Sequence, residues 1–407
     1  MRVKLYSIIL ILNSFITGLI VPVLSLLLMD KGATMSTISV IMGIYSFTVM
    51  TFELPSGIMA DLIGRKRMFI LSLVMSLIYS SVILLGQGFF VLCAGIFIYG
   101  LNRAVSSGSF EALFIDFYIN EFGKEKLSHG TALIHVLEIS GLSVGALDGG
   151  LLPEVSKNYF HTLGTYDLNL LARIPLIAAV IILSCIFINE TNDSIGKQIS
   201  IKQHIRNSSN IVMKNKNIIC IFISVFSTGF FLSSLETYWQ PHFVSMITDE
   251  NLMMFLGVMS FLYFAASMAG SILSSKIMTK ANIKKMYLIL RLILFISLIL
   301  MSLQTNIISF AFFYSFIYFI FGMANIPEGV IINTEILSEF RASILSVNSL
   351  MLQFGVLAGS IANSIIIKYT PIPILWMVAA GVVLLSILII YKGLTGEQSD
   401  EGTIEIG

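Results

Sequence analysis

Charged residues are scarce in this chain, and their scarcity decides its class. Only 12% of the 407 residues are charged, whereas 56% are hydrophobic and the mean hydropathy is +0.91. A soluble domain is typically about one quarter charged. The composition therefore excludes a soluble protein and predicts one that crosses a membrane several times.

The residues that build reactive and metal centres are also few. The three cysteines lie within or at the edge of apolar runs, and none of the five histidines forms a pair with ligand spacing. No glycine-rich phosphate loop followed by Lys-Ser/Thr occurs, and no nucleophile and base motif stands out. A net charge of +1 gives no reason to expect binding to nucleic acid. We therefore expect no enzyme, no ATPase engine, no metal and no cofactor.

Long apolar runs predict twelve transmembrane helices, since about 20 residues cross ~30 Å of hydrocarbon. The first run follows Arg2 and Lys4, exceeds a signal-peptide core and is expected to remain as one helix. We predict an N-terminal six-helix bundle over 1–189, a cytoplasmic linker over 190–216, a second bundle over 217–392 and a disordered acidic tail over 393–407. The predicted spans are 5–29, 36–60, 68–87, 89–114, 131–153, 168–189, 217–240, 252–276, 286–304, 307–333, 343–367 and 372–391.

The distribution of Lys and Arg predicts the orientation. With the N-terminus in the cytoplasm, eighteen of the 24 basic residues lie inside, three outside and three within helices. The positive-inside rule then places both termini in the cytoplasm of a multi-pass protein in the cell (inner) membrane. The three within helices are Arg103, Arg173 and Arg291.

Residues 57–67, Gly-Ile-Met-Ala-Asp-Leu-Ile-Gly-Arg-Lys-Arg, pack two glycines, one acid and three bases between two apolar runs. We expect a cytoplasmic hairpin in which Gly57 admits a neighbouring helix and Gly64 adopts the positive φ of a sharp turn. The stretch resembles the loop between helices 2 and 3 of the major facilitator superfamily, G-x-L-A-D-x-x-G-R-[KR]. That resemblance implies twelve helices in two pseudo-symmetric bundles around a midplane cavity.

The resemblance also implies a cytoplasmic gate. In similar proteins the aspartate and first arginine of this loop bridge helices and hold the outward-open state. The corresponding residues here are Asp61 and Arg65, with Asp116 at the end of helix 4 as the acidic partner. The alternative is that the basic residues only enforce topology, which leaves Asp61 without a role.

A second motif lies in helix 5, where residues 141–150 read Gly-Leu-Ser-Val-Gly-Ala-Leu-Asp-Gly-Gly. It resembles g-x-x-x-G-P-x-x-G-G of the drug/proton antiporter branch, with Ala146 in place of proline. The glycines spaced by four lie on one helix face and predict close packing on a partner. The alternative is close packing with no bearing on transport direction. The motif residues are Gly141, Gly145, Gly149 and Gly150.

A faint repeat relates the two halves of the sequence. The stretch 111–116, Glu-Ala-Leu-Phe-Ile-Asp, corresponds to 328–333, Glu-Gly-Val-Ile-Ile-Asn, and Gly141 and Gly145 correspond to Gly355 and Gly359. These parallel positions predict two related bundles.

Ionisable residues at membrane depth indicate coupling chemistry, because each is costly unless it faces a cavity or a partner. Counting ~1.5 Å per residue along the helices places Arg103 at the depth of Glu138, and Asp148 at the depth of Arg173. We expect both to be ion pairs that act in proton coupling or substrate binding.

Three acids remain for proton transfer. Glu328 is the first candidate, because it lies deep and follows Pro327, which can break helix 10. Glu236 is the second, and the alternative is an outer interfacial anchor formed with Tyr238 and Trp239. Glu53 is equally a structural partner of a basic group at the inner end.

These observations predict a proton-coupled exporter of lipophilic or cationic small molecules that works by alternating access. We expect it to be a monomer with membrane lipids around it. Abundant Phe, Met and Tyr suit a promiscuous apolar cavity. The alternatives are a dedicated exporter or importer of one metabolite, such as a siderophore or sugar, and a lipid flippase.

Overall fold

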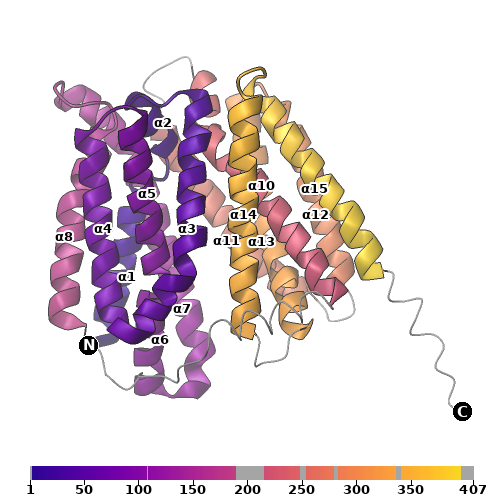
Figure 1. The fold of residues 1–407 in the computed structure, drawn as a ribbon, viewed down its shortest axis with the longest axis horizontal. Coiled ribbons are helices and arrows are strands. Elements are labelled where there is room, and N and C mark those ends of the chain that lie inside the picture. Colours follow the sequence, from indigo (N-terminus) through magenta and orange to yellow (C-terminus); the bar gives the residue numbers. More distant parts are fainter. Residues whose placement is uncertain are drawn as a thin grey trace, which may run out of the picture. The chain divides into compact units, whose positions relative to one another are not determined.

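The computed structural model is helical throughout the part of the chain that it describes, residues 2–107, 109–188, 215–247, 254–278, 283–335 and 341–395. Within these ranges eleven helices are long and apolar enough to cross a membrane, and a shorter apolar helix covers Val3–Gly18. The twelve predicted spans therefore all correspond to apolar helical segments, and Figure 1 shows them as ribbons.

The described residues of the first half form eight helices and a short 3-10 turn, and α1, α4, α6, α7 and α8 share an apolar core. Tyr6 stacks on Phe117 with ring centroids 4.6 Å apart, and Phe114 and Ile177 are fully buried beside them. The elements are α1 (Arg2–Gly18), α2 (Leu24–Asp30), α3 (Met35–Ile63), α4 (Arg65–Leu85), α5 (Phe89–Ser106), α6 (Ser109–Phe122), η1 (Lys124–Lys126), α7 (Leu127–Tyr159) and α8 (Asp167–Phe187).

The described residues of the second half form six more helices. Trp376 is fully buried there, and its indole N–H donates to the Ser234 carbonyl at 3.3 Å. The elements are α10 (Lys216–Ser245), α11 (Phe255–Ile277), α12 (Ile283–Ser302), α13 (Ile307–Glu335), α14 (Arg341–Ile366) and α15 (Ile372–Thr395).

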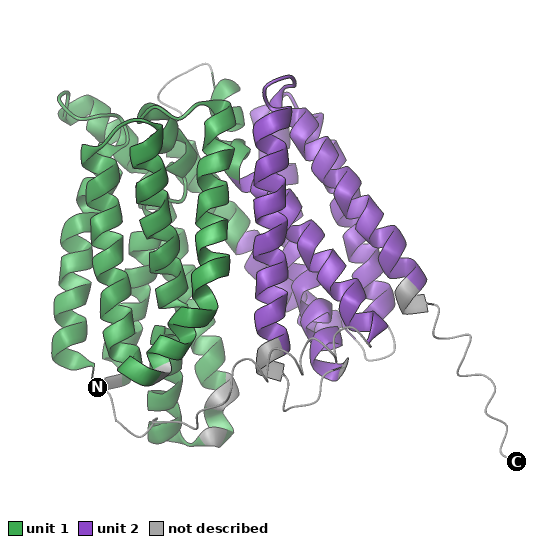
Figure 2. Ribbon diagram, in the orientation of Figure 1, with its two compact units in different colours: residues 1–197, 237–264 green, residues 198–236, 265–407 purple. Residues whose placement is uncertain are grey.

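The chain divides into two compact units, which Figure 2 shows in different colours. Unit 1 comprises 1–197 and 237–264, and unit 2 comprises 198–236 and 265–407. The last turns of α10 and the first half of α11 therefore belong to unit 1. The bundle boundaries at 1–189 and 217–392 stay a prediction. Nearly all of the predicted linker and tail, 189–214 and 396–407, lies outside the described residues.

The first predicted span is not one helix. Helix α1 ends at Gly18, and α2 begins at Leu24. Tight turns connect them, and in one of these the Val21 N–H donates a hydrogen bond to the Gly18 carbonyl. Pro22 has no N–H to continue the helical ladder. The fourth predicted span is likewise divided, into α5 and α6. By contrast Pro327 lies inside α13 without ending it, so the expected break of helix 10 is wrong.

Candidate functional site

The glycines of the helix 5 motif bring α7 against α1. A methyl group placed on Gly141, Gly145 or Gly149 would overlap the backbone of α1. On the next face Gly150 lies equally close to the backbone of α11 within unit 1. The predicted close packing is confirmed, and each glycine is needed because backbone meets backbone.

The same crossing recurs in unit 2. Methyl groups on Gly355 and Gly359 of α14 would overlap the backbone of α10 at Phe226 and Phe230. Gly229 of α10 faces α14 as Gly18 of α1 faces α7. The repeat seen in the sequence is therefore a repeat of helix crossings in the two units.

The hairpin between α3 and α4 turns at Gly64, whose φ of 107° confirms the predicted positive value. Arg65 begins α4, and its Nη1 lies 2.6 Å from Oδ2 of Asp116 on α6. The expected partner of Arg65 is thus in place, although the Asp61 side chain lies outside the described residues. Outside the adjacent backbone of its own helix, no atom of the described residues lies within 4 Å of a Cβ built at Gly57, so the expectation that Gly57 admits a neighbouring helix stays a prediction.

Arg173 does not pair with Asp148. Its buried guanidinium points to α4, where Nη2 donates to Ser76 Oγ at 3.3 Å and the group lies 5.3 Å from the Tyr79 ring centroid. The expected ion pair is therefore wrong, because the guanidinium lies against α4 instead.

Asp148 instead lines an open groove of about 330 Å³ in unit 1. The remaining lining is apolar, and the Asp148 carboxylate has no hydrogen bond or ion pair to any described residue. Such a groove offers a single negative charge on an apolar surface. The other lining residues are Phe15, Leu19, Leu151, Leu152, Ala172 and Leu176.

Arg103 does not face Glu138 directly either. The carboxylates whose charges act on Arg103 are those of Glu111 on α6 and Glu53 on α3. Glu53 also accepts a hydrogen bond from Ser107 Oγ at 3.1 Å. The charge of Glu138 acts on Glu111 instead. Arg103 and Glu138 are therefore not the direct ion pair that was expected.

Glu328 lies in a polar network inside unit 2. The Tyr287 hydroxyl donates to Glu328 Oε2 at 2.7 Å and also lies 2.5 Å from Ser224 Oγ. Helices α10, α12 and α13 therefore meet at one tyrosine hydroxyl. The carboxyl group is half-buried, while the tyrosine is fully buried.

Arg291, one turn after Tyr287 on α12, completes this network. Its guanidinium is buried and donates to Thr228 Oγ1 at 2.7 Å, to the Ser224 carbonyl at 3.3 Å and to Ser227 Oγ. Its positive charge also acts on Glu328. No described carboxylate lies within ion-pair distance of Arg291, so hydroxyls and a carbonyl hold the cation.

Glu236 lies on α10 next to the boundary between the units. The hydroxyl of Tyr318 on α13 donates to its Oε1 at 3.2 Å within unit 2. Tyr238 and Trp239 follow on the same helix and are buried, whereas Glu236 itself is exposed. The alternative of an interfacial anchor stays a prediction.

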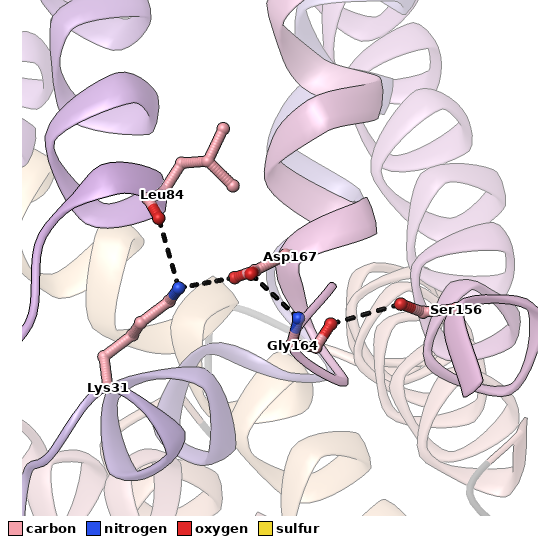
Figure 3. A network of polar contacts seen from close by, with 5 residues as sticks. All are labelled: Lys31, Leu84, Ser156, Gly164 and Asp167. Carbon is pink, nitrogen blue, oxygen red and sulfur yellow. Dashed lines mark hydrogen bonds and ion pairs between the residues drawn. The ribbon is translucent and has the colours of Figure 1, made fainter. Parts of the chain in front are cut away.

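A further network of polar contacts lies within unit 1, as Figure 3 shows. Lys31 Nζ lies 2.7 Å from Asp167 Oδ1 and donates to the Leu84 carbonyl at 3.1 Å. Partial burial and the charge of Asp167 raise the pKa of nearby Asp30, and Lys31 lowers it. Burial and the charge of Asp30 raise the pKa of Tyr166 to about 12.

Two members of the unit 2 network were not predicted as functional. The sequence shows Arg291 as an arginine at membrane depth, and Tyr287 precedes it by four residues, on the same helix face. Both residues can therefore be picked out from the sequence. Their connection to Glu328 cannot, because Glu328 lies on another helix.

Comparisons with known proteins agree with this architecture. At 24% identity the chain resembles the MFS-type transporter YxaM of Bacillus subtilis (strain 168) over 235 residues, 56% of each chain. It is also 24% identical to the quinolone resistance protein NorA of Staphylococcus aureus over 166 residues, 41% of each chain. The chain thus spans about half the length of the curated relatives it matches.

Solved structures share the fold over nearly the whole chain. The crystal structure of the nucleoside transporter NupG matches with a TM-score of 0.80 at 14% identity, covering 97% of this chain and 100% of that one. A bacterial homologue of the human lysosomal transporter Spinster matches with a TM-score of 0.68 at 12% identity, covering 96% and 94%.

The sequence profile of the family described as Major Facilitator Superfamily matches residues 6–340. The match includes the hairpin at 57–67, the glycine motif of α7 and the network around Glu328. The protein belongs to the major facilitator superfamily and is a multi-pass protein of the cell (inner) membrane.

Proposed function

We propose that this transporter exports lipophilic or cationic small molecules in exchange for protons, by alternating access, with both termini in the cytoplasm. The network around Glu328 is the observation that supports this most. A carboxyl group at membrane depth, hydrogen-bonded by Tyr287 and facing Arg291, has the chemistry of a proton carrier. We infer that it acts within a monomer.

The coupling step follows from the charges of this network. When Glu328 is protonated, the described groups that accept hydrogen bonds from the Arg291 cation are neutral hydroxyls and a carbonyl. When Glu328 is ionised, its charge balances Arg291, and the Tyr287 hydroxyl donates to it. Both states are therefore accommodated, and a local change in hydration shifts the balance between them.

The substrate class rests on separate features. Asp148 in its apolar groove and Glu236 beside Tyr318 each offer a carboxylate to a cation. NorA, a relative of 24% identity, is named for resistance to quinolones. The solved structures that share the fold are less than 25% identical to this chain in sequence, so they do not favour any substrate. Arg65 with Asp116, together with Asp61 of the same hairpin sequence, would serve as the cytoplasmic gate.

Transport in proteoliposomes with an imposed pH gradient tests the proposal, with ethidium as a fluorescent cationic probe. The wild-type protein should concentrate ethidium against its gradient. Glu328→Gln should bind and exchange ethidium but fail to concentrate it, because the proton step is gone. Glu236→Gln should mainly weaken ethidium binding. Glu121→Gln, on the exposed end of α6, is the matched control and should behave as wild type.

Concentrative transport by Glu328→Gln with an unchanged pH dependence would place the carrier elsewhere, and Asp148 would be tested next. Movement of a single metabolite but not of ethidium would indicate the dedicated transporter. Translocation of labelled phospholipid without a pH gradient would indicate a flippase.

A further inference from the structure

The groove around Asp148 lies between α1, α7 and α8 of unit 1. Asn169 of α8 ties its walls together, because its Nδ2 donates to the Leu19 carbonyl at 2.8 Å and to the Gly149 carbonyl at 2.7 Å. Leu19 lines the groove, and Gly149 directly follows Asp148. Asn169 is fully buried. A buried, hydrogen-bonded side chain thus fixes the spacing of the walls.

Asp148 lies within an exposed apolar stripe on α7. The side chains of Val144, Leu151 and Val155 are exposed, as is that of Asp148. These four residues are spaced by three or four positions, as on one helix face. Gly150, which contacts α11, points about 200° away from Asp148, so α11 does not cover the stripe. An exposed surface of valine and leucine suits contact with lipid chains.

The carboxylate of Asp148 lies at membrane depth. Val144 is the middle residue of the span His129–Tyr159, and Asp148 follows it by four residues, or about 6 Å along the helix. The hydrocarbon extends about 15 Å on either side of its middle. A charge at this depth is costly unless a partner offsets it. No described residue forms a hydrogen bond or ion pair with Asp148, and a cationic ligand would supply the partner.

The lining of the groove selects the class of ligand. The described lining residues carry one negative charge and no positive one. A monocation matches this charge, whereas the phosphate of a zwitterionic phospholipid would be left in apolar surroundings without a partner. The volume of about 330 Å³ lies at the lower end of the range of about 300–1,000 Å³ for ligand pockets. It therefore suits one alkyl chain and not two.

The groove also discriminates between head groups. A carboxylate accepts hydrogen bonds, and an ammonium group with N–H bonds donates them with the added strength of opposite charges. A quaternary ammonium donates none and is recognised by a cage of aromatic rings. Phe15 is the single aromatic side chain among the described residues that line the groove. Asp148 therefore suits a primary ammonium better than a quaternary one.

We infer that this groove binds a single-chain primary alkylammonium ion, which enters from the hydrocarbon of the membrane. Asp148 accepts the hydrogen bonds of the ammonium group, and apolar side chains of α1, α7 and α8 cover the alkyl chain. Delivery of this ion to a transport pathway rests on the proposed export of lipophilic cations, but its binding in the groove does not. Ethidium, a flat quaternary cation without a long alkyl chain, represents a different class of ligand.

Binding of radiolabelled dodecylamine to the purified protein tests the inference. The protein is reconstituted in nanodiscs of phosphatidylcholine, and empty nanodiscs give the background from partition into lipid. Asp148→Asn should lower the affinity at least tenfold, and Asp148→Glu should restore part of it. Glu154→Gln, an equal change of charge on the same helix but outside the groove, should bind as the wild-type protein does. Equal affinity of Asp148→Asn and the wild-type protein overturns the inference.

Competition by unlabelled compounds tests the class of ligand. Dodecylamine should displace the label at a concentration at least tenfold lower than dodecyltrimethylammonium, which lacks N–H bonds, and than dodecanol, which lacks the charge. Equal potency of the quaternary compound overturns the assignment of a primary ammonium. Displacement by short-chain phosphatidylethanolamine at the same concentration as dodecylamine would assign the groove to a lipid, which overturns the inference as well.

A photoaffinity measurement on the wild-type protein covers the case in which the Asp148 variants do not fold. A dodecylamine with a diazirine on its chain loses N₂ on illumination, and the resulting carbene inserts into a neighbouring C–H bond. Peptide mass spectrometry locates the adduct. We expect adducts at lining residues of the groove on α1, α7 or α8, and their loss in the presence of excess unlabelled dodecylamine. Adducts confined to other helices overturn the inference.

The transport arm uses dodecylamine as an inhibitor of ethidium exchange in proteoliposomes. No pH gradient is imposed, because a lipophilic amine dissipates one. Ala172→Leu fills part of the groove and should raise the half-inhibitory concentration at least fivefold. Ala179→Leu, at an exposed position of α8 outside the groove, should leave it unchanged.

The outcomes of this arm separate the two proposals. Equal half-inhibitory concentrations in the two leucine variants, with binding as expected, overturn the role of the groove in transport and leave it as a binding site. If the wild-type protein neither exchanges nor concentrates ethidium, the proposed function fails, while the binding of dodecylamine still decides the assignment of the groove.

Discussion

Gln240 of α10 accepts a hydrogen bond from the backbone N–H of Ser25 at 2.8 Å, and its amide donates to the Val21 carbonyl at 2.7 Å. Both backbone groups flank the interruption between α1 and α2. A transmembrane helix can be interrupted only where other groups satisfy the freed backbone. One side chain, 97% buried and 215 residues away from Ser25 along the chain, supplies both bonds.

Gln240→Ala should therefore destabilise unit 1. A buried backbone group left without a partner costs about 1–3 kcal/mol, and this substitution strands two. We expect a clear fall in the melting temperature of the purified protein, followed by intrinsic fluorescence. Gln87→Ala removes an exposed glutamine and should leave the melting temperature unchanged. Equal melting temperatures for both variants would show that water replaces the bonds.

Two glycine substitutions give opposite expectations. At Gly145→Ala the new methyl group overlaps the Phe15 backbone, and overpacking of this kind costs about 1–3 kcal/mol or more. At Gly57→Ala the methyl group meets open space, and alanine favours a helix by about 1 kcal/mol over glycine. Folded yield in the membrane should fall for the first and hold or rise for the second. A fall in both would indicate an unrecognised partner of Gly57.

The ion pair of Arg65 and Asp116 should matter for transport more than for stability. The two side chains are 26% and 54% exposed, and exposed pairs contribute only about 0–1 kcal/mol. We expect Arg65→Gln and Asp116→Asn to reduce transport at least tenfold with little change in melting temperature. Asp61→Asn should reduce transport by a similar factor.

The charge-swapped double variant, Arg65→Asp with Asp116→Arg, should recover part of the transport lost in the single variants. Full activity of the single variants at equal expression would instead show that these residues serve only topology.

Asp30 makes the stability of unit 1 depend on pH. Its pKa in the folded protein is raised above 3.8, so the charged form is less favourable in the folded state than in the unfolded chain. Stability contributed by this group is thus greatest below pH 3.8 and falls as the pH rises through the folded pKa. Asp30→Asn should raise the melting temperature at pH 7 and have no such effect below pH 3.8. A gain of equal size at both pH values would contradict this assignment.

Much of the architecture was predictable because apolar runs have the length of a membrane crossing. The turn at Gly64 was predictable too, since a glycine between two long runs permits positive φ. Both features depend on residues close together in the sequence. The interruption between α1 and α2 was not predictable, because the residue that satisfies it lies on α10.

The partners of the intramembrane arginines were the main error. Counting residues gives the depth of Arg103 and Arg173, and depth alone paired them with Glu138 and Asp148. Successive residues on a helix differ by about 100° in direction, so matching depth does not bring two side chains together. Arg173 turns to Tyr79 on α4, and the acids whose charges act on Arg103 are Glu111 and Glu53, not Glu138.

The glycine crossings of α7 on α1 and of α14 on α10 also have a mechanical consequence. Where backbones touch without interlocking side chains, one helix can slide along the other with few rotamer changes, as in shear motions of packed helices. The contact of α8 with α4 is of the opposite kind, because the Arg173 guanidinium lies against Tyr79 and holds the two in register. Within unit 1 compliance is therefore concentrated along α1 and α7, and rigidity along α4 and α8.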